Sequence, residues 1–396
     1  MVTVTNNVET AEELDMLRKL VRDFRKKELL PLEELVITRE ANRGMSDDPI
    51  IPPDVNARLL EKAKEAGLWG IDVPEEYGGL GLGYTAKMVV LEELSQSIVP
   101  FILPPETPNL HFLIACCNEQ QREEYLLPYA RGEKKSNLAL TEPNAGSDAG
   151  GIQMRAVRKG DKWVLNGQKT FISGAASTDF LITLAVTDPE KGSRGGITAF
   201  LVDRHTPGLE VTRGMATIGE FHPYEVYYND VTLDDSKVLG AVGEGFEPLK
   251  NRLGVRRIEL AMRSVAMATR ALNMMIDYAK IRKTFGQPLA DRQAIQWWIA
   301  DAYTKIEASK LMIYDVARKL DAGVKDIAKE TSMVKVFATE MATEVVDNSI
   351  QAHGGTGVTK DLPLEYMYRL LRIYRIVEGP SEIHRWTIAR DLIRER

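Results

Sequence analysis

The sequence predicts an α+β protein that is mostly α-helical, with a helical N-terminal domain, a middle antiparallel β-barrel or β-sheet domain and a C-terminal four-helix bundle. Two observations carry this prediction. Short β-prone runs are confined to the middle of the chain, and long apolar stripes at helical spacing fill its last third. The 396 residues allow two or three domains, which we expect at 1–135, 136–240 and 241–396. No long linker separates them, so we expect one packed unit.

The N-terminal region carries helix start and stop signals. Thr10-Ala-Glu-Glu13 matches a capping box and opens an amphipathic helix. A similar apolar pattern over residues 55–67 stops at Gly67. The Gly-rich segment 77–83 contains no G-x-G-x-x-G, so it favours a plain turn over a phosphate loop, ahead of a helix that runs to about Ser95.

The middle region has the texture of a sheet. Two short β-prone runs, 162–165 and 169–172, flank Asn166-Gly167, a strong hairpin signal. Further strands are expected at 180–187, 196–202 and 225–233. Several short strands separated by turn residues are typical of a compact antiparallel sheet or barrel.

The last region contains three apolar stripes with spacings of three and four, within residues 258–279, 295–320 and 334–352. Each stripe places its residues on one helix face, as in an antiparallel four-helix bundle. The second and third stripes end at Gly323 and Gly354, which are natural helix stops.

Composition excludes several classes of protein. The net charge of −6 argues against a dedicated nucleic-acid binder, and no window has about 18 uninterrupted apolar residues for a membrane span. The N-terminus resembles neither a secretory signal nor a transit peptide. Cys116 and Cys117 are adjacent and fit a reducing compartment, so we expect a cytoplasmic protein. No metal-ligand spacing is present, and no metal is expected.

Glu378 is the strongest candidate for catalysis. It stands in the segment I-V-E-G-P-S, where Pro380 disfavours helical geometry at Gly379 and Ser381 can cap a following helix. A carboxylate on a tight loop between two helices, beside apolar residues, would be suited to proton abstraction. An ordinary solvated glutamate at a helix junction explains the same local pattern.

Three other segments could bind a ligand, and each has a plain alternative. Residues 141–148 (T-E-P-N-A-G-S-D) favour turns that expose N–H groups and hydroxyls, as a surface loop also does. Residues 282–286 (R-K-T-F-G) end a long helix with Gly286 at the C′ position, and could also bind and stack on a nucleotide. Residues 351–357 (Q-A-H-G-G-T-G) likewise end a helix, and we expect His353 to be structural.

The order of these motifs resembles the acyl-CoA dehydrogenase family. T-E-P-x-A-G-S-D is followed by N-G-Q-K-x-x-I-S, R-x-x-F-G, Q-x-x-G-G-x-G and E-G-P-S-E, and the similarity runs from about residue 10 to the C-terminus. The resemblance implies that family's helix–sheet–helix fold and a role in acyl-CoA catabolism.

The resemblance also implies a reaction, the FAD-dependent α,β-dehydrogenation of an acyl-CoA to the trans-2-enoyl-CoA. Glu378 would abstract the α-proton while flavin N5 accepts the β-hydride, and an electron-transfer flavoprotein would take the electrons. A flavin ribityl hydroxyl and the main-chain N–H of Glu378 would bind the thioester oxygen.

The resemblance assigns further residues. The implied cofactor-binding residues are Leu138, Leu140, Thr141, Ser147, Phe171, Ser173, Arg282, Phe285, Gln293, Gln351, Gly354 and Gly355. The implied substrate-binding residues are Ser147, Arg257, Val377 and Gly379. The cofactor residues from Arg282 onward would hold the ADP half of FAD across a subunit interface, which implies a homodimer or homotetramer.

Some positions depart from the better-known straight-chain members. Leu138 and Phe171 replace a frequent aromatic residue and a frequent Trp, while Val377, Pro380 and Glu382 replace Tyr, Thr and Gln. The E-G-P segment and the Pro-rich segment 100–108 resemble the branch that contains acyl-CoA dehydrogenase family member 11 more than they resemble the straight-chain members. Some members place the base at the position of Arg256, which leaves Glu378 as the better candidate.

Two other functions remain open at this point. An oxidase or a flavin monooxygenase has the same fold, although the retained Glu378 argues against a monooxygenase. A non-catalytic scaffold that binds CoA or a protein is the third hypothesis. Acyl length, branching and ring content are not set by the sequence.

Overall fold

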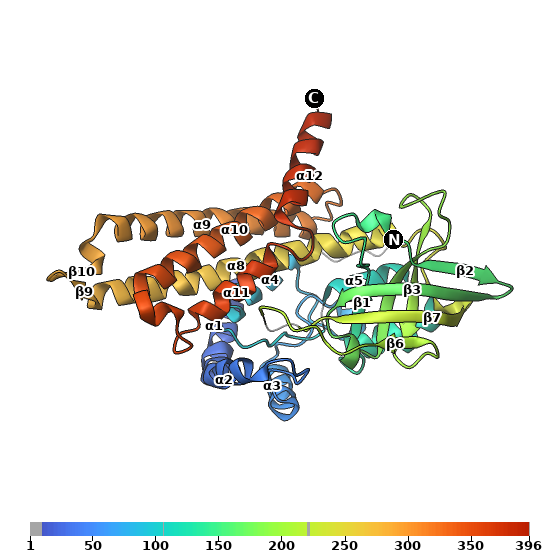
Figure 1. Ribbon diagram of the computed structural model, residues 1–396, viewed down its shortest axis with the longest axis horizontal. Helices are drawn as coiled ribbons and strands as arrows, with labels where there is room; N and C mark the ends of the chain where they lie inside the picture. Colours follow the sequence, from blue (N-terminus) through green and yellow to red (C-terminus); the bar gives the residue numbers. More distant parts are fainter. Residues whose placement is uncertain (1–9, 106, 220–221, 396) are drawn as a thin grey trace.

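The computed structural model describes residues 10–105, 107–219 and 222–395. Figure 1 shows the helices gathered around the long α8 (Phe246–Ile281) and the strands gathered at one end of it. The predicted helical, β and helical order is therefore confirmed. The expectation that the N-terminus is no signal or transit peptide rests mainly on residues 1–9, which lie outside the described residues.

The N-terminal region is helical. Its helices are α1 (Ala11–Phe24), α2 (Glu33–Arg43), α3 (Pro53–Glu65), α4 (Tyr84–Leu94), α5 (Thr107–Cys116), α6 (Glu119–Gln121) and α7 (Leu127–Ala130). The capping box is confirmed, since the Glu13 N–H donates to Thr10 Oγ1 at 3.2 Å and the Thr10 N–H donates to Glu13 Oε2 at 2.7 Å. At Gly83 a Cβ would lie 2.5 Å from Asp321 Oδ1, so a side chain there would displace the Asp321 carboxylate, which accepts from the Tyr84 N–H at 2.6 Å.

The middle region is one sheet with the order β6-β7-β3-β2-β4-β5-β8, with β1 beside β4. The strands are β1 (Ser136–Ala139), β2 (Arg155–Lys159), β3 (Lys162–Ile172), β4 (Phe180–Val186), β5 (Ile197–Asp203), β6 (Leu209–Val211), β7 (Tyr224–Asp234) and β8 (Val238–Leu239). Most pairs are antiparallel, but β1 and β2 each pair with β4 in parallel. The sheet is therefore mixed, because other strands lie in the chain between β4 and each of these two partners, so neither pair is joined by a hairpin.

The predicted hairpin at Asn166-Gly167 is wrong. Residues 162–172 form the single strand β3, and the turn from β2 lies at Gly160, whose φ is 66°. Asn166-Gly167 is instead an irregularity in the pairing of β3 with β7. Asn166 Nδ2 donates to Asp230 Oδ1 at 2.9 Å and Asn166 Oδ1 accepts from the Asp230 N–H at 2.9 Å, so the sheet uses these turn-forming residues inside a strand.

The C-terminal region contains α8, α9 (Gln293–Asp321), α10 (Ala328–His353), α11 (Leu364–Tyr374) and α12 (Ser381–Arg394). All three predicted stripes face the core, with most of their side chains buried. The expected four-helix bundle corresponds to α8–α11, while α12 projects from the body of the molecule (Figure 1).

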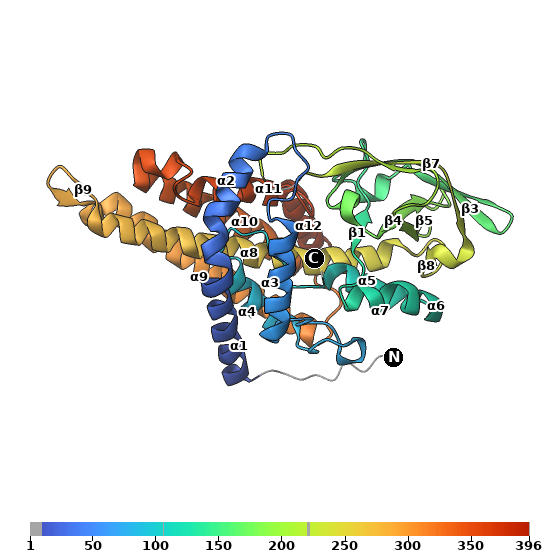
Figure 2. The same ribbon diagram turned by 90° about the horizontal axis from the view of Figure 1, so that it is seen from below.

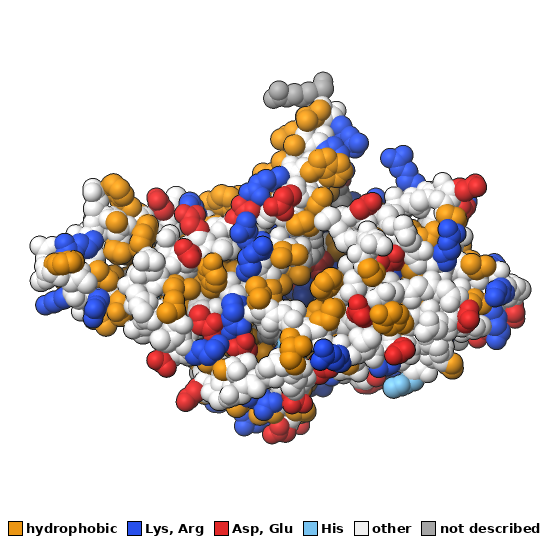
Figure 3. Space-filling view, in the orientation of Figure 1, with side chains coloured by type: hydrophobic (Ala, Val, Ile, Leu, Met, Phe, Trp, Pro, Cys, Tyr) orange, Lys and Arg blue, Asp and Glu red, His pale blue; other side chains and the backbone are white. Residues whose placement is uncertain are grey.

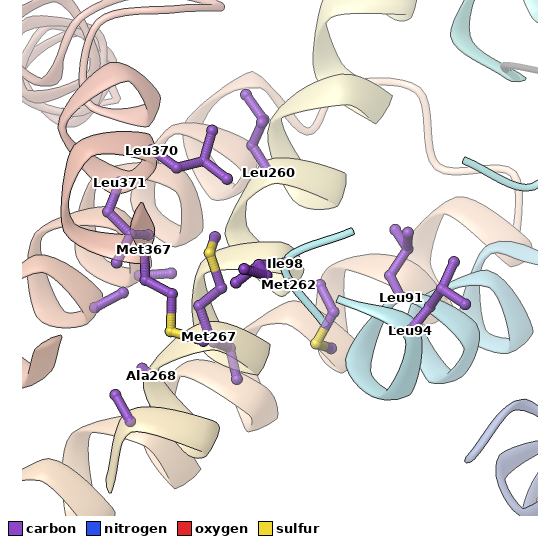
Figure 4. Packing of buried hydrophobic residues seen from close by; sticks show 14 of the residues in the cluster. Leu91, Leu94, Ile98, Leu260, Met262, Met267, Ala268, Met367, Leu370 and Leu371 are labelled. Atoms are coloured by element: carbon purple, nitrogen blue, oxygen red, sulfur yellow. The ribbon is translucent and has the colours of Figure 1, made fainter. Parts of the chain in front are cut away.

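One hydrophobic core joins the two helical regions. Figure 4 shows α8 between two neighbours, with Leu91 and Leu94 of α4 on one side and Met367 and Leu370 of α11 on the other. The view in Figure 2 agrees, because α4 and α11 both lie against α8. The helical regions therefore pack as one unit, as expected, whereas the domain boundaries stay a prediction.

The end of α8 differs from the prediction for residues 282–286. The helix stops at Ile281, and a small hairpin follows, formed by β9 (Lys283–Thr284) and β10 (Gln287–Pro288). Phe285 and Gly286 form its tip with φ of 50° and 80°. Two consecutive positive φ values define a primed hairpin turn, so Gly286 serves this turn and is not a helix C′ residue.

Among the helices that the structure describes, none has the length and apolar character needed to cross a membrane. Cys116 and Cys117 are both free and partly buried at the end of α5. Burial raises the pKa of Cys116 to about 11 and that of Cys117 to about 12, so both thiols are poor nucleophiles.

Candidate active site

Glu378 lies on the loop between α11 and α12, as the sequence predicts. Its φ is 55° and that of Gly379 is 98°, and the Glu378 side chain is 18% exposed. Pro380 occupies the N-cap position of α12, so Ser381 is the first residue of the helix and not its cap. A residue other than glycine at positive φ is strained, and such strain gathers at functional sites.

Two cationic side chains hold this loop by its backbone. Arg257 Nε on α8 donates to the main-chain oxygen of Glu378 at 3.2 Å. Lys335 Nζ on α10 donates to the main-chain oxygen of Gly379 at 2.7 Å. Arg257, which the resemblance implies as a substrate-binding residue, therefore also supports the loop that carries Glu378. Lys335 is not predictable from the sequence, because a single lysine in a buried helix has no local signature.

The environment of the loop shifts several pKa values. Burial, with Arg257 nearby, lowers the pKa of Lys335 to about 8. Burial, together with Arg257 and Lys335, lowers the pKa of the fully buried His384 to about 3, so its ring is neutral. Burial also lowers the pKa of Arg257, while the Glu378 carboxylate opposes this shift. The loop thus lies among partly desolvated positive charges.

A third cation reaches the carboxylate itself. Arg252 Nη1 on α8 lies 3.3 Å from Glu378 Oε2 and 3.4 Å from Oε1. Arg252 Nε donates to Asn109 Oδ1 at 3.1 Å, and Asn109 Nδ2 donates to the main-chain oxygen of Ser136 at 3.0 Å. The site therefore forms where α5, α8, β1 and the loop before α12 meet.

A pocket between α4 and α8 lies one helical turn beyond Arg252. Its walls are mostly apolar, from Ile71, Val90, Leu91, Leu94, Ile102, Leu103, Pro104 and Pro105. Its polar residues form a buried network in which Lys87 Nζ contacts Asp72 Oδ2 at 2.9 Å and Glu259 Oε1 at 2.5 Å. Although burial opposes the shift, Lys87 lowers the pKa of both carboxylates to about 2, so they remain ionised.

The predicted flavin-loop residues belong to two segments, one at and after the end of β1 and one at the end of β3. The Thr170 N–H donates to the main-chain oxygen of Thr141 at 2.8 Å, which joins the two segments. The predicted residues are Leu138, Leu140, Thr141, Ser147, Phe171 and Ser173. Phe171 has a φ of 57° and is 63% exposed, so it presents an aromatic face outside the hydrophobic core. An exposed ring in a strained conformation indicates a ligand or partner surface.

A buried ion pair that the sequence analysis did not identify fixes this loop. Lys169 Nζ donates to Glu142 Oε1 at 2.7 Å and to the main-chain oxygen of Leu140 at 2.9 Å. The same carboxylate accepts from the N–H groups of Gln153 and Met154. Glu142 belongs to the motif T-E-P-x-A-G-S-D and Lys169 to the motif N-G-Q-K-x-x-I-S. Their opposite charges were the only sequence feature that could have predicted this ion pair.

The other predicted cofactor residues lie at the far end of the bundle. Arg282 and Phe285 follow the last turn of α8, and Tyr278 of α8 stacks on His353 at 4.4 Å, which places Gly354 at the same end. Gln293, Gln351 and Gly355 belong to the same end by sequence position. The 36 residues of α8 span ~54 Å at 1.5 Å per residue, so the structure separates the two predicted cofactor groups.

Two glycines in the predicted cofactor-binding segments indicate whether FAD could approach the backbone. A Cβ built on Gly146 or Gly355 would meet no described atom within 4 Å, and neither residue has a positive φ. Neither conformation nor crowding within the described chain therefore requires glycine there. Both positions leave room for close approach of a ligand or of another chain, and the residues fit FAD in this respect.

Exposed apolar side chains mark two surfaces. Phe285 is 99% exposed at the tip of the β9–β10 hairpin. Trp386, Leu392 and Ile393 are 57%, 49% and 75% exposed on the projecting α12, where hydrophobic side chains gather in Figure 3. Among the described residues, no cluster of three or more His, Cys, Asp or Glu could hold a metal ion.

Comparisons with known proteins cover most of the chain. Family models for the N-terminal, middle and C-terminal domains of acyl-CoA dehydrogenases match residues 11–133, 137–231 and 243–393. The (R)-benzylsuccinyl-CoA dehydrogenase of Thauera aromatica is 45% identical over 389 residues, which are 97% of this chain and 96% of that protein.

Two further proteins extend the comparison. Subunit CarC of the caffeyl-CoA reductase–Etf complex of Acetobacterium woodii is 36% identical, over 97% of this chain and 99% of that protein. The solved structure of butyryl-CoA dehydrogenase from Megasphaera elsdenii matches with a TM-score of 0.85 and 28% identity, over 98% of this chain and 100% of that chain.

Proposed function

The chain belongs to the acyl-CoA dehydrogenase family, FAD-dependent oxidoreductases that act on the CH–CH bond of acyl-CoA thioesters, and on this premise we propose that Glu378 is its catalytic base. The reaction would convert an acyl-CoA to its trans-2-enoyl-CoA. The observation that carries the proposal is the strained, cation-supported loop that presents the Glu378 carboxylate between α8 and α12.

The main-chain N–H of Glu378 has a second role in this proposal. It donates no hydrogen bond to any residue that the structure describes. It is thus free to bind the thioester oxygen, where negative charge develops as Glu378 Oε removes the α-proton. Bound FAD would supply the acceptor for the β-hydride.

We further propose that one active site uses two subunits. The flavin-loop residues around Phe171 and the exposed hairpin tip at Phe285 lie at opposite ends of α8. A single FAD cannot span an α-helix of ~54 Å. A second copy of the chain would bring its Phe285 and Arg282 to the first copy's Phe171, as expected for a homodimer or homotetramer.

An electron-transfer flavoprotein is the proposed electron acceptor. The supporting observation is the similarity to a subunit of the caffeyl-CoA reductase–Etf complex. A cytoplasmic location also stays a prediction. The branch similar to family member 11 has no support from the relatives compared above.

The test uses purified, FAD-loaded protein under anaerobic conditions with a panel of CoA thioesters. We expect at least one thioester to bleach the oxidised flavin, and the stoichiometric product to be the trans-2-enoyl-CoA. Protein that binds no FAD on reconstitution would contradict the proposal. Rapid reoxidation of the reduced flavin by oxygen, with no transfer to an electron-transfer flavoprotein, would favour an oxidase.

A further inference from the structure

Arg252 is held in a fixed orientation beside the proposed base. Its side chain is 11% exposed, and its Nε is bound to the buried Asn109. Asn109 is held in turn by the main chain of Ser136. Ordering an arginine in this way costs side-chain entropy on folding. Because the side chain is already ordered, this cost does not recur when a ligand binds, so the guanidinium is preorganised toward Glu378.

The immediate surroundings of Glu378 carry excess positive charge. Arg252, Arg257 and Lys335 are three cations that contact Glu378 or Gly379, and the Glu378 carboxylate is the one anionic group among these contacts. Arg257 and Lys335 donate to main-chain oxygens, which cancel no formal charge. A partly buried excess of cations favours the binding of an anion.

Two other carboxylates act on Lys335 but do not neutralise Arg252. Glu382 is exposed at the start of α12. Glu340 is hydrogen-bonded to Arg385 on the outer side of α10. The guanidinium of Arg252 therefore has Glu378 as its one charged partner within the described residues.

The pair of Arg252 with Glu378 is loose. Its distances of 3.3 and 3.4 Å exceed the ~2.8 Å of a strong charge-assisted hydrogen bond, so the guanidinium can take another anionic partner. Arg252 Nη2 makes no hydrogen bond to any described residue.

There is also space near the loop. Gly254 is buried in α8, yet a Cβ built on it would meet no described atom within 4 Å. Arg257 lies three residues further on and hence on the same helix face, the face that holds the Glu378 backbone. A substrate group beside this face would meet Arg257 and the loop that carries Glu378.

We propose that Arg252 binds a free carboxylate on the acyl group, so the substrates are acyl-CoA thioesters that carry a second carboxylate close to the reacting carbons. This inference rests on the proposed function of Glu378. The substrate carboxylate takes Arg252 Nη1 and Nη2 as a bidentate partner and releases Glu378 for proton abstraction. The phosphates of CoA are not the anion, because the pantetheine arm separates them from the thioester.

The test compares matched thioesters on the FAD-loaded enzyme. Succinyl-, glutaryl- and adipyl-CoA are each paired with the thioester of the corresponding methyl monoester, and the rate of anaerobic flavin bleaching is measured against concentration. We expect at least one diacid thioester to be favoured over its methyl ester by ~100-fold in the second-order rate constant. In Arg252→Gln this preference should fall to near one, and Arg252→Lys should keep part of it.

The control is Arg158→Gln, which removes an exposed arginine of β2 that pairs with Asp235; its preference should match that of the wild type. Equal or faster bleaching by the methyl esters in the wild type would overturn the role of Arg252 and leave the proposed function standing. So would an Arg252→Gln variant slowed equally with both members of a pair. Bleaching by no thioester at all would overturn both proposals.

Discussion

The buried ammonium of Lys335 donates a 2.7 Å hydrogen bond to the main-chain oxygen of Gly379, the residue that follows Glu378. Arg257 holds the neighbouring main-chain oxygen of Glu378 at 3.2 Å. Cations from α10 and α8 thus fix two consecutive residues with positive φ. The loop of the proposed base owes its shape to two helices that are remote from it in sequence.

Removal of the Lys335 amine should misplace the base. Lys335→Met keeps the length of the side chain but leaves the Gly379 oxygen without its donor, so we expect kcat to fall ~10- to 100-fold with FAD content unchanged. Steady-state kinetics and flavin absorbance measure the two effects. Lys325→Met, at an exposed position, is the matched control, and an unchanged kcat in Lys335→Met would contradict the positioning role.

Lys335 should also make stability depend on pH. Its pKa of about 8 in the folded protein lies below the usual 10.5 of a lysine. Between these values the unfolded chain binds more protons, so the free energy of unfolding rises with pH in this window and the cost of the buried charge is greatest below it. The difference in unfolding free energy between wild type and Lys335→Met should therefore shift in favour of the wild type from pH 8 to 10.5. A difference independent of pH would show that Lys335 does not titrate in this window.

Phe171 should contribute to flavin binding through its exposed ring. Phe171→Ala should raise the FAD dissociation constant by at least ~5-fold, since an aromatic contact adds about 1 kcal/mol beyond area burial. Phe171→Trp retains an aromatic face and should bind nearly as well as the wild type. Fluorescence titration of the apoprotein with FAD measures both, and equal affinity of all three proteins would place the flavin elsewhere.

A complementation experiment tests the shared active site. Glu378→Gln and Arg282→Ala should each be inactive alone. Mixed oligomers refolded from the two variants contain sites with an intact Glu378 from one chain and an intact Arg282 from its partner. We therefore expect activity to reappear on mixing, whereas no recovery in verified mixed oligomers would mean that both residues serve the same chain's site.

Short sequence patterns correctly predicted the helix ends and loops that are determined by a few neighbouring residues. The capping box at Thr10, the helix stop at Gly67 and the loop position of Glu378 before Pro380 each depend on a few adjacent residues. The apolar stripes predicted the bundle because burial of a helix face repeats every three or four residues.

Two predictions of local structure were wrong, because the same residue types also occur in other conformations. Asn166-Gly167 has the composition of a hairpin turn, but Gly160 provides the turn and Asp230 binds the Asn166 side chain within the sheet. Gly286 has the residue type of a helix C′ position, but α8 already ends at Ile281, and Phe285 and Gly286 both adopt a positive φ in the hairpin that follows.

The site was predictable only in part, because it joins residues remote in sequence. Glu378 was identified from its loop and from the motif order. Its contacts with Arg252 and Arg257, and the contact of Lys335 with Gly379, span 126, 121 and 44 residues. No periodicity or turn signal connects such positions, so these contacts required the fold.

The central claim is that Glu378 removes the α-proton, and its most direct test is single-turnover flavin bleaching by Glu378→Gln. Gln keeps the size of the side chain but cannot accept the proton, so we expect FAD to bind normally and bleaching by a thioester that reduces the wild type to slow by at least ~1,000-fold. Bleaching by Glu378→Gln at the wild-type rate would show that another group is the base.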